Sequence, residues 1–211
     1  MNSNQESAIE VRGLIDQQIE VLEIMQVQAK RLKERFKKTE QKEWIPSTIS
    51  AELSFQTTHL LNTVIRNASD VEVPPIGPSA GIDKGLEDEI ADVVFNIMNL
   101  ANLGSLNIRQ AIEVAIQQNY QFIIDSQDAI LKASNIVIQA GELWDAIFRK
   151  EGFKHMSRGE ESNEVYIQMV FGGIIICTIL LARDLNIDIN KGFNEMIIDS
   201  NKSLDRMGIE S

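Results

Sequence analysis

The sequence predicts an all-α protein folded as a helical bundle, on the strength of three observations. Only four prolines occur in 211 residues, and three of them lie in one short segment, residues 71–81. The alternation of apolar and polar residues that is typical of strands is almost absent, whereas apolar residues recur at helical spacing. Hydrophobic residues make up 44% of the chain, enough for a sizeable core without disulfides or a structural metal.

Helical periodicity predicts the elements in order along the chain. The first is a long amphipathic helix at about residues 6–42, which Pro46 ends, and the second covers about residues 50–67. A loop rich in Pro and Gly follows to residue 82. Asn107 resembles an N-cap with Gln110 three residues later, and it opens the fourth helix. The remaining helices are expected at about residues 83–103, 127–151, 160–184 and 188–207.

A strongly apolar segment, residues 165–182, is about long enough to cross a bilayer. Gln168, the pair Gly172 and Gly173, and Thr178 interrupt it. Neither an aromatic belt nor a flanking cluster of Lys and Arg accompanies it. A helix that is apolar on all sides is either a core helix or a membrane span. We interpret this one as the core helix of the bundle, and we expect no membrane partner.

Two nine-residue segments, LANLGSLNI at 100–108 and LARDLNIDI at 181–189, resemble each other within the chain. Their Leu-Ala pairs match, and the proposed N-caps Asn107 and Asp188 keep the same separation from them. Each segment follows a very apolar helix and precedes a shorter one, which indicates an internal duplication. We therefore divide the chain into a long N-terminal helix (1–46), a first half (47–125) and a second half (126–211). The halves are expected to pack as one compact bundle, a pseudo-dimer within a single chain.

Charge and cysteine content limit the expected partners and compartment. The formal net charge of −11 repels phosphate backbones and anionic lipid, so a nucleic-acid polymer is not an expected ligand. A small nucleotide can still bind if a divalent cation neutralises its phosphates. The single cysteine, Cys177, cannot form an intrachain disulfide, and the chain opens with polar residues, so we expect a cytoplasmic protein.

Two pairs of carboxylates lie at helical spacing. Glu89 and Asp92 are three residues apart and Asn96 and Asn99 continue their stripe, while Glu142 and Asp145 form the second pair. Two fixed carboxylates, completed by water and phosphate oxygens, satisfy a hard cation such as Mg²⁺. Acidic residues are also common on the solvated faces and first turns of helices, which is the alternative explanation for each pair.

As a set, these motifs resemble the MazG and dimeric dUTPase superfamily of nucleotide pyrophosphohydrolases. The segment 89–108 (EIADVVFNIMNLANLGSLNI) is similar to the E-x-x-D helix of that family and to the ending that follows it. The segment 140–155 (AGELWDAIFRKEGFKH) is similar to the E-x-x-E helix and its loop, and 200–208 (SNKSLDRMG) looks like the late Asn/Lys segment. The resemblance extends over about residues 49–208.

The resemblance implies two MazG-like halves in which four carboxylates hold Mg²⁺, or Mn²⁺ in its place, on a nucleoside triphosphate. Water attacks an inner phosphorus, and the products are the nucleoside monophosphate and pyrophosphate, a house-cleaning hydrolysis. Trp144 is a candidate for stacking on the base, with a core anchor as the alternative. The substrate-binding candidates as a group are Asn96, Trp144, Lys154, Arg158, Asn201 and Lys202.

Both halves depart from the family pattern. In the first half, His59 and Asn62 fall where the E-x-x-E carboxylates are expected, and in the second half Val170 and Gly173 replace the E-x-x-D pair. Three arrangements therefore stay open. One metal site forms across the halves, or a second-half site forms with two further carboxylates, or catalysis has been lost and a helical scaffold or interaction protein remains, alone or as a homodimer. The cross-half set is Glu89, Asp92, Glu142 and Asp145, and the second-half set is Glu142, Asp145, Glu161 and Glu164.

Overall fold

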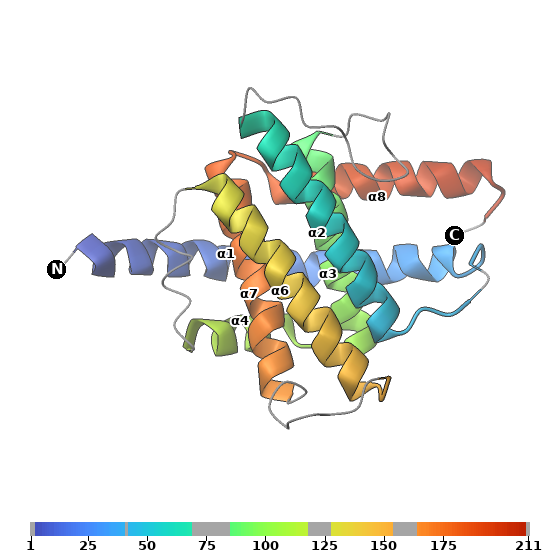
Figure 1. Ribbon diagram of the computed structural model, residues 1–211. Helices are drawn as coiled ribbons and strands as arrows, with labels where there is room; N and C mark the ends of the chain where they lie inside the picture. Colours follow the sequence, from blue (N-terminus) through green and yellow to red (C-terminus); the bar gives the residue numbers. More distant parts are fainter. Residues whose placement is uncertain (1–2, 41, 69–84, 118–127, 154–163, 210–211) are drawn as a thin grey trace.

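The computed structural model describes residues 3–40, 42–68, 85–117, 128–153 and 164–209 (Figure 1). Over these residues the chain forms seven helices and no strand, which confirms the all-α class. The helices are α1 (Ser3–Phe36), α2 (Pro46–Ala68), α3 (Leu86–Gly104), α4 (Ile108–Gln117), α6 (Ala129–Lys150), α7 (Glu164–Asp184) and α8 (Ile189–Arg206).

The boundary between the first two helices differs from the prediction. The first helix was expected to continue to about residue 42, but α1 ends at Phe36, because the N–H and the hydroxyl of Thr39 both donate to the Phe36 carbonyl. Pro46 begins α2 instead of only ending the helix before it. A proline fits this first helical position because the N–H that it lacks would have no partner inside the helix.

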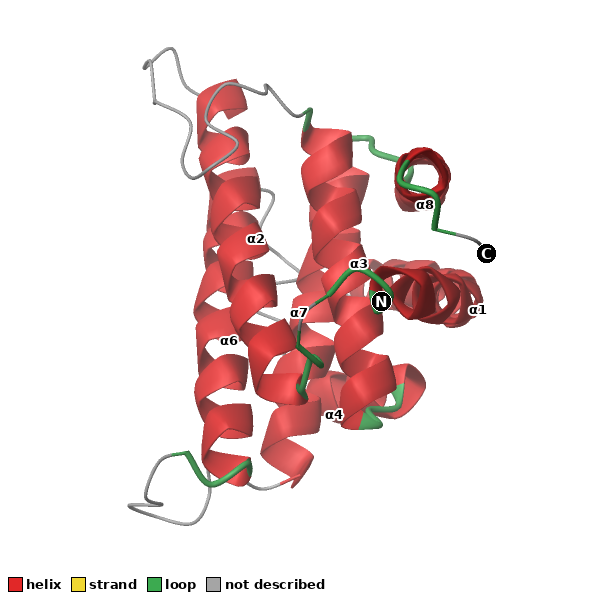
Figure 2. Cartoon of the chain, turned by 90° about the vertical axis from the view of Figure 1, so that its right-hand side faces the viewer, coloured by secondary structure: helices red, strands yellow, loops and turns green. Residues whose placement is uncertain are grey.

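The helices form three layers, which Figure 2 shows edge-on. In one outer layer α2 and α6 pack on each other, and behind them α2 contacts α3 while α6 contacts α7. The opposite layer contains α1, α4 and α8, with α4 packed on α7 and α8 packed on α3. The helices of the middle layer, α3 and α7, are therefore covered from two sides, which explains why they are the most apolar of the bundle.

The apolar helix α7 lies inside this bundle. By length and composition it is the one helix in the described part of the chain that could cross a membrane. However, 78% of its most apolar 18-residue stretch is buried inside the fold. A Cβ atom on Gly172 would overlap the carbonyl oxygen of Ala111, so α4 and α7 approach each other more closely than a side chain would allow. The packing of a core helix accounts for the composition of this segment.

The two similar turns predicted from the sequence have the same backbone geometry. Ser105 and Asn186 both adopt a left-handed conformation, with φ of 52° and 54°. In the first turn the N–H of Leu106 bonds the carbonyl of Ala101 at 3.0 Å, and in the second the N–H of Ile187 bonds that of Ala182 at 2.8 Å. These are the bonds that close a helix with a left-handed residue after its end.

The predicted N-caps are confirmed in both turns. The Asn107 side-chain oxygen accepts from the N–H of Gln110 at 2.8 Å, and that of Asp188 accepts from the N–H of Lys191 at 3.1 Å. Each short helix then leaves the long helix that precedes it and packs on the long helix of the other half, α4 on α7 and α8 on α3. The halves thus exchange their short helices.

Candidate functional site

A stripe of polar side chains runs along α3 in the first half. Glu89, Asp92, Asn96 and Asn99 follow one another at spacings of three, four and three residues, which places them on one face of the helix. Glu89, Asn96 and Asn99 are 5%, 6% and 2% exposed. The first turn of α3 also carries Glu87 and Asp88, where acidic side chains interact favourably with the helix dipole.

The neighbouring helix α2, which packs on α3, has buried polar residues of its own. His59 and Asn62 are 8% and 7% exposed. The ring of His59 lies 4.4 Å from that of Phe55, and its Nε2 atom has no hydrogen-bond partner among the described residues. The side-chain oxygen of Asn99 likewise has none there. We call the six residues His59, Asn62, Glu89, Asp92, Asn96 and Asn99 the first-half polar group.

The second half replaces the α3 stripe with apolar residues. The repeated turns are 81 residues apart, and the same step from the stripe residues leads to four buried positions of α7, which are Val170, Gly173, Cys177 and Leu180. Burial raises the pKa of the Cys177 thiol from 9.0 to about 12. The thiol therefore stays protonated well above neutral pH, as is usual for a buried cysteine that only fills space in a core.

The carboxylates of the second half lie near the surface. Glu142 is exposed, and Asp145 accepts a hydrogen bond from Nε of Arg149 at 2.6 Å. Glu164, also exposed, accepts from Nζ of Lys150 at 2.5 Å. Glu161 lies outside the described residues. Asp145 and Glu164 are each bonded to a basic side chain, and the structure does not gather the described members of the second-half set around a common point.

The two carboxylate pairs of the cross-half set lie toward opposite ends of the bundle. α3 and α6 begin at the same end, because Lys132 in the first turn of α6 pairs with Asp184, at the end of α7. From there a short turn leads to Lys191, which lies 3.9 Å from Glu87 in the first turn of α3. Figure 1 shows both helix starts at the same end.

Glu142 follows the start of α6 by 13 residues, which at 1.5 Å per residue is about 20 Å along the helix. Glu89 and Asp92 lie in the first two turns of α3, and α3 packs on α2 and not on α6. The structure therefore does not bring Glu89 and Asp92 together with Glu142 and Asp145. Within the described residues, no three His, Cys, Asp or Glu side chains lie close enough to hold a metal ion.

The substrate-binding candidates are also dispersed. The Asn96 amide donates to the carbonyl of Asp92 at 2.9 Å, inside the first-half polar group. Trp144 is 42% exposed on α6 and lies against Phe148, so it is not a core anchor. Asn201 accepts from Arg35 of α1, and Lys202 pairs with Asp199 at 2.9 Å, both in the opposite layer. Lys154 and Arg158 lie outside the described residues.

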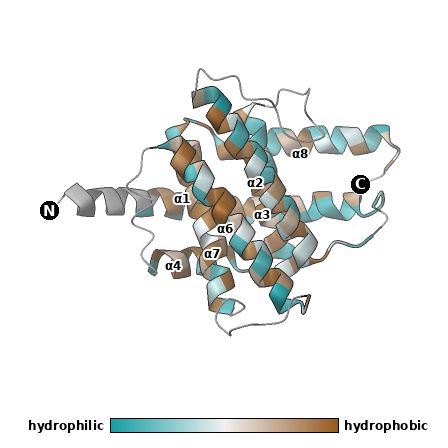
Figure 3. Cartoon of the chain, viewed as in Figure 1, coloured by the Kyte–Doolittle hydropathy of each residue, from teal (hydrophilic) through white to brown (hydrophobic). Residues whose placement is uncertain are grey.

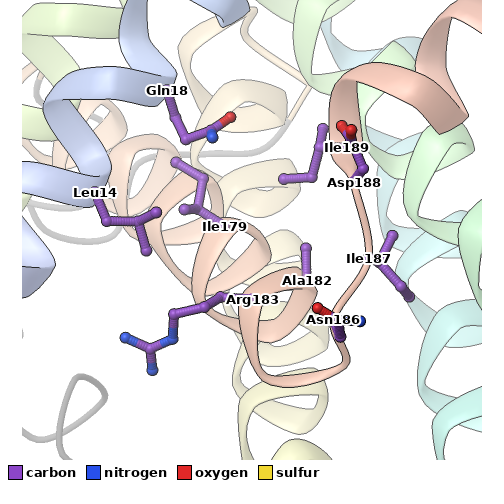
Figure 4. Close-up of a pocket in the computed structure, with 9 residues that line it drawn as sticks. All are labelled: Leu14, Gln18, Ile179, Ala182, Arg183, Asn186, Ile187, Asp188 and Ile189. Carbon is purple, nitrogen blue, oxygen red and sulfur yellow. The ribbon is translucent and has the colours of Figure 1, made fainter.

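Two cavities that the sequence analysis did not anticipate lie where α1 meets the repeated turns. The larger, of about 400 Å³, is bounded by Leu14 and Gln18 of α1 and by the turn at residues 186–189 (Figure 4). The smaller, of about 300 Å³, is bounded by Glu23 and Gln26 of α1 and by the turn at residues 105–108. Neither contains a predicted site residue. Their positions follow the internal repeat, which together with the N-caps Asn107 and Asp188 marked these turns in the sequence.

No protein-family model, no curated protein and no solved structure matches this chain. The two halves of the chain differ in that α3 buries polar residues where α7 buries apolar ones. The first-half polar group is therefore the candidate site.

Proposed function

We propose that the protein binds a nucleotide together with a divalent cation at the first-half polar group. The observation that carries this proposal is the burial of Glu89, Asn96 and Asn99 at positions where α7 holds apolar residues. Burying a polar group costs about 1–3 kcal/mol when its hydrogen bonds are incomplete. Since α7 fills the same places with Val, Cys and Leu, packing alone does not require the polar residues, and a ligand is the better explanation.

The chemistry of the group indicates the class of ligand. Glu89 and Asp92 offer two carboxylates from one helix face, and hard cations such as Mg²⁺ prefer oxygen ligands. Two carboxylates leave most coordination positions to water and to phosphate oxygens of the ligand. The donor set therefore fits an ion that arrives with a phosphorylated ligand. Mg²⁺ or Mn²⁺ would neutralise the charge of the phosphates, which the protein, with its net charge of −11, would otherwise repel. The amides of Asn62 and Asn96 can donate to the ligand's oxygens.

Hydrolysis of a nucleoside triphosphate to monophosphate and pyrophosphate is the second candidate function. The resemblance to MazG proteins implies it, with the metal neutralising charge and orienting water when bound. α2 offers His59 and Asn62 where that family has two more carboxylates. The His59 Nε2 atom, buried and without a hydrogen-bond partner in the described part of the chain, could accept a proton from an attacking water.

The test compares the two carboxylate pairs by calorimetry with Mg²⁺ and a panel of ribo- and deoxyribonucleoside triphosphates. The variant carrying Glu89→Gln and Asp92→Asn is expected to lose at least about tenfold in affinity, equivalent to about 1.4 kcal/mol. The matched control carries Glu142→Gln and Asp145→Asn in the second half and should bind like the wild type. Equal losses in both variants, or no binding of any nucleotide by the wild type, would contradict the proposal.

The hydrolase candidate needs a separate readout, because binding and turnover can be lost independently. Pyrophosphate release from the nucleotide that binds best should require Mg²⁺ and should fall at least about hundredfold in His59→Ala, as for the loss of a general base. The calorimetric affinity of this variant should change much less. If the wild type binds the nucleotide but releases no pyrophosphate, the binding function stands and the hydrolase function is contradicted.

A further inference from the structure

The two cavities beside α1 are lined by corresponding residues of the internal repeat. The smaller cavity uses residues 101, 102 and 105–108, and the step of 81 residues converts this set into 182, 183 and 186–189, all of which line the larger cavity. A different part of α1 completes each of them. In Figure 3 α1 shows hydrophobic and hydrophilic residues next to one another, as expected for a helix that covers a core with one face. The two cavities can therefore be compared position by position.

Bonds within the protein connect the two sides of the smaller cavity. The Asn102 side chain donates to the backbone carbonyl of Gln26 at 3.1 Å, and Arg109 pairs with Glu23 at 3.3 Å. Both bonds join α1 to the elements on either side of the first repeated turn. In the first half, the polar groups beside the cavity thus have partners in the protein itself.

The larger cavity has no such connection. The residue that corresponds to Asn102 is Arg183, and its Nε and Nη2 atoms both pair with the neighbouring Asp184, at 2.9 and 2.7 Å. Figure 4 shows the Arg183 guanidinium pointing away from the turn. Within the described residues, no hydrogen bond or ion pair joins α1 to residues 183–190. α1 and the second repeated turn therefore face each other across an open space.

Two carboxamides line this space and are not used by the fold. Gln18 of α1 is half-buried and is directed toward the turn (Figure 4), and Asn186 is the left-handed residue of the turn. Neither side chain has a hydrogen-bond partner in the described part of the chain. The Asp188 carboxylate, in contrast, caps α8 by accepting from the N–H of Lys191. The charged groups of the lining already have partners, so the cavity offers uncharged polar groups to a ligand.

The rest of the lining is apolar, and it includes the buried residues Ile179 and Ala182, which are 3% and 1% exposed. A volume of about 400 Å³ with apolar walls and a few polar groups is typical of small-molecule sites. A carboxamide carries an acceptor oxygen beside an NH₂ donor, so its complement is a group with N–H and C=O side by side. The lining residues with apolar side chains are Leu14, Ile179, Ala182, Ile187 and Ile189.

We propose that the larger cavity binds a small, uncharged molecule that carries an amide or lactam group on a flat ring. Nucleobases and aromatic amides share this chemistry. The carboxamides of Gln18 and Asn186 bond the amide or lactam group, and the ring lies on the apolar wall. The cavity lies between α1, α7 and the start of α8, whereas the first-half polar group belongs to α2 and α3. This site needs no metal ion and does not rest on the proposed nucleotide binding.

Titration of the full chain, followed by ligand-observed NMR in buffer with a chelator, tests the proposal with three probes. Uracil represents the lactams and nicotinamide the open amides, and at least one of them should bind with a dissociation constant of about 1 mM or below. Nicotinate, which has a carboxylate in place of the amide of nicotinamide, should bind at least about tenfold more weakly than the better of these two probes. The stronger of the two uncharged probes identifies the kind of ring ligand that the cavity accepts.

A pair of matched variants places the binding in the larger cavity. Gln18→Leu with Asn186→Gly removes both carboxamides, and glycine keeps the left-handed conformation of the turn without strain. This variant should lose at least about tenfold in affinity for the probe that binds best. The control, Gln26→Leu with Ser105→Gly, makes the corresponding changes at the smaller cavity and should bind like the wild type.

Two further measurements separate this site from other causes. Far-UV circular dichroism establishes that each variant keeps its helix content, so that lost affinity is not lost fold. The variant with Glu89→Gln and Asp92→Asn should bind the probe like the wild type, because the first-half polar group is a different site. The proposal is overturned if neither uncharged probe binds at about 10 mM. Equal binding of nicotinate, or equal affinity in the carboxamide variant and its control, would also overturn it.

Discussion

The two halves of the molecule fill equivalent positions with opposite kinds of side chain. The middle-layer helix of the first half buries Glu89, Asn96 and Asn99, whereas that of the second half buries only apolar residues at these places. In the outer layer α2 likewise buries the polar residue His59, whereas the corresponding residue of α6, Glu142, is exposed. The first half thus keeps a costly polar group at positions that the second half fills with apolar residues of the core.

A second difference concerns a buried charge. Lys132 of α6 is completely buried and pairs with Asp184 of α7. The corresponding positions of the first half hold Ile49 and Leu103, an apolar pair. Because the fold forms with either kind of residue at these positions, it does not require the ion pair. The first half shows which apolar residues can take the places of Lys132 and Asp184.

The largest effect is expected from breaking this ion pair. Asp184→Ala leaves the Lys132 ammonium buried without its carboxylate and should lower the free energy of unfolding by about 3–5 kcal/mol. The double variant Lys132→Ile with Asp184→Leu, which copies the first half, should return to within about 1 kcal/mol of the wild type. Urea denaturation followed by circular dichroism measures both. A double variant as unstable as the single one would mean that the halves are not interchangeable here.

A smaller effect of opposite sign is expected in the first half. Asn99 is 2% exposed and its side-chain oxygen has no hydrogen-bond partner in the described part of the chain. Asn99→Leu, which copies Leu180 of α7, should raise the free energy of unfolding by about 1 kcal/mol. It should also weaken nucleotide binding, as measured by calorimetry. A destabilised variant would show that Asn99 is needed for packing, and the functional explanation of the stripe would lose its basis.

The smallest effect is absent at neutral pH and grows in alkali. The folded-state pKa of Cys177 lies near 12 and its ordinary value is 9.0, so above pH 9 the unfolded chain loses the thiol proton first. The stability that this thiol contributes is complete below pH 9 and falls as the pH rises from 9 towards 12. Wild type should therefore lose stability faster over this range than Cys177→Ala. Denaturation curves at pH 8, 9 and 10 make the comparison, and parallel losses would contradict it.

The sequence predicted well those features that short segments determine. The repeated turns depend on Asn107 and Asp188 as caps and on one left-handed residue each, all within a few residues of one another. The run of apolar residues likewise identified α7 as a core helix. In both cases the local pattern is itself the physical cause of the structure.

The candidate site could not be predicted in the same way, because it depends on which helices pack together. The spacing of Glu89 and Asp92, or of Glu142 and Asp145, fixes only that each pair shares a helix face. Whether the two pairs meet is decided by the contacts of α3 and α6 with their neighbours, and these helices do not pack on each other. The burial of Asn99 was also invisible in the sequence, where it reads as one more polar residue of a stripe.

The exchange of α4 and α8 has a consequence for folding. Each long middle helix is covered by a short helix that belongs to the opposite half, so neither half encloses its own hydrophobic residues. A chain cut between α4 and α6 would give two fragments, each of which exposes the surface that the other normally covers. Each half therefore depends on the other to bury its apolar residues, and the two halves fold and unfold together.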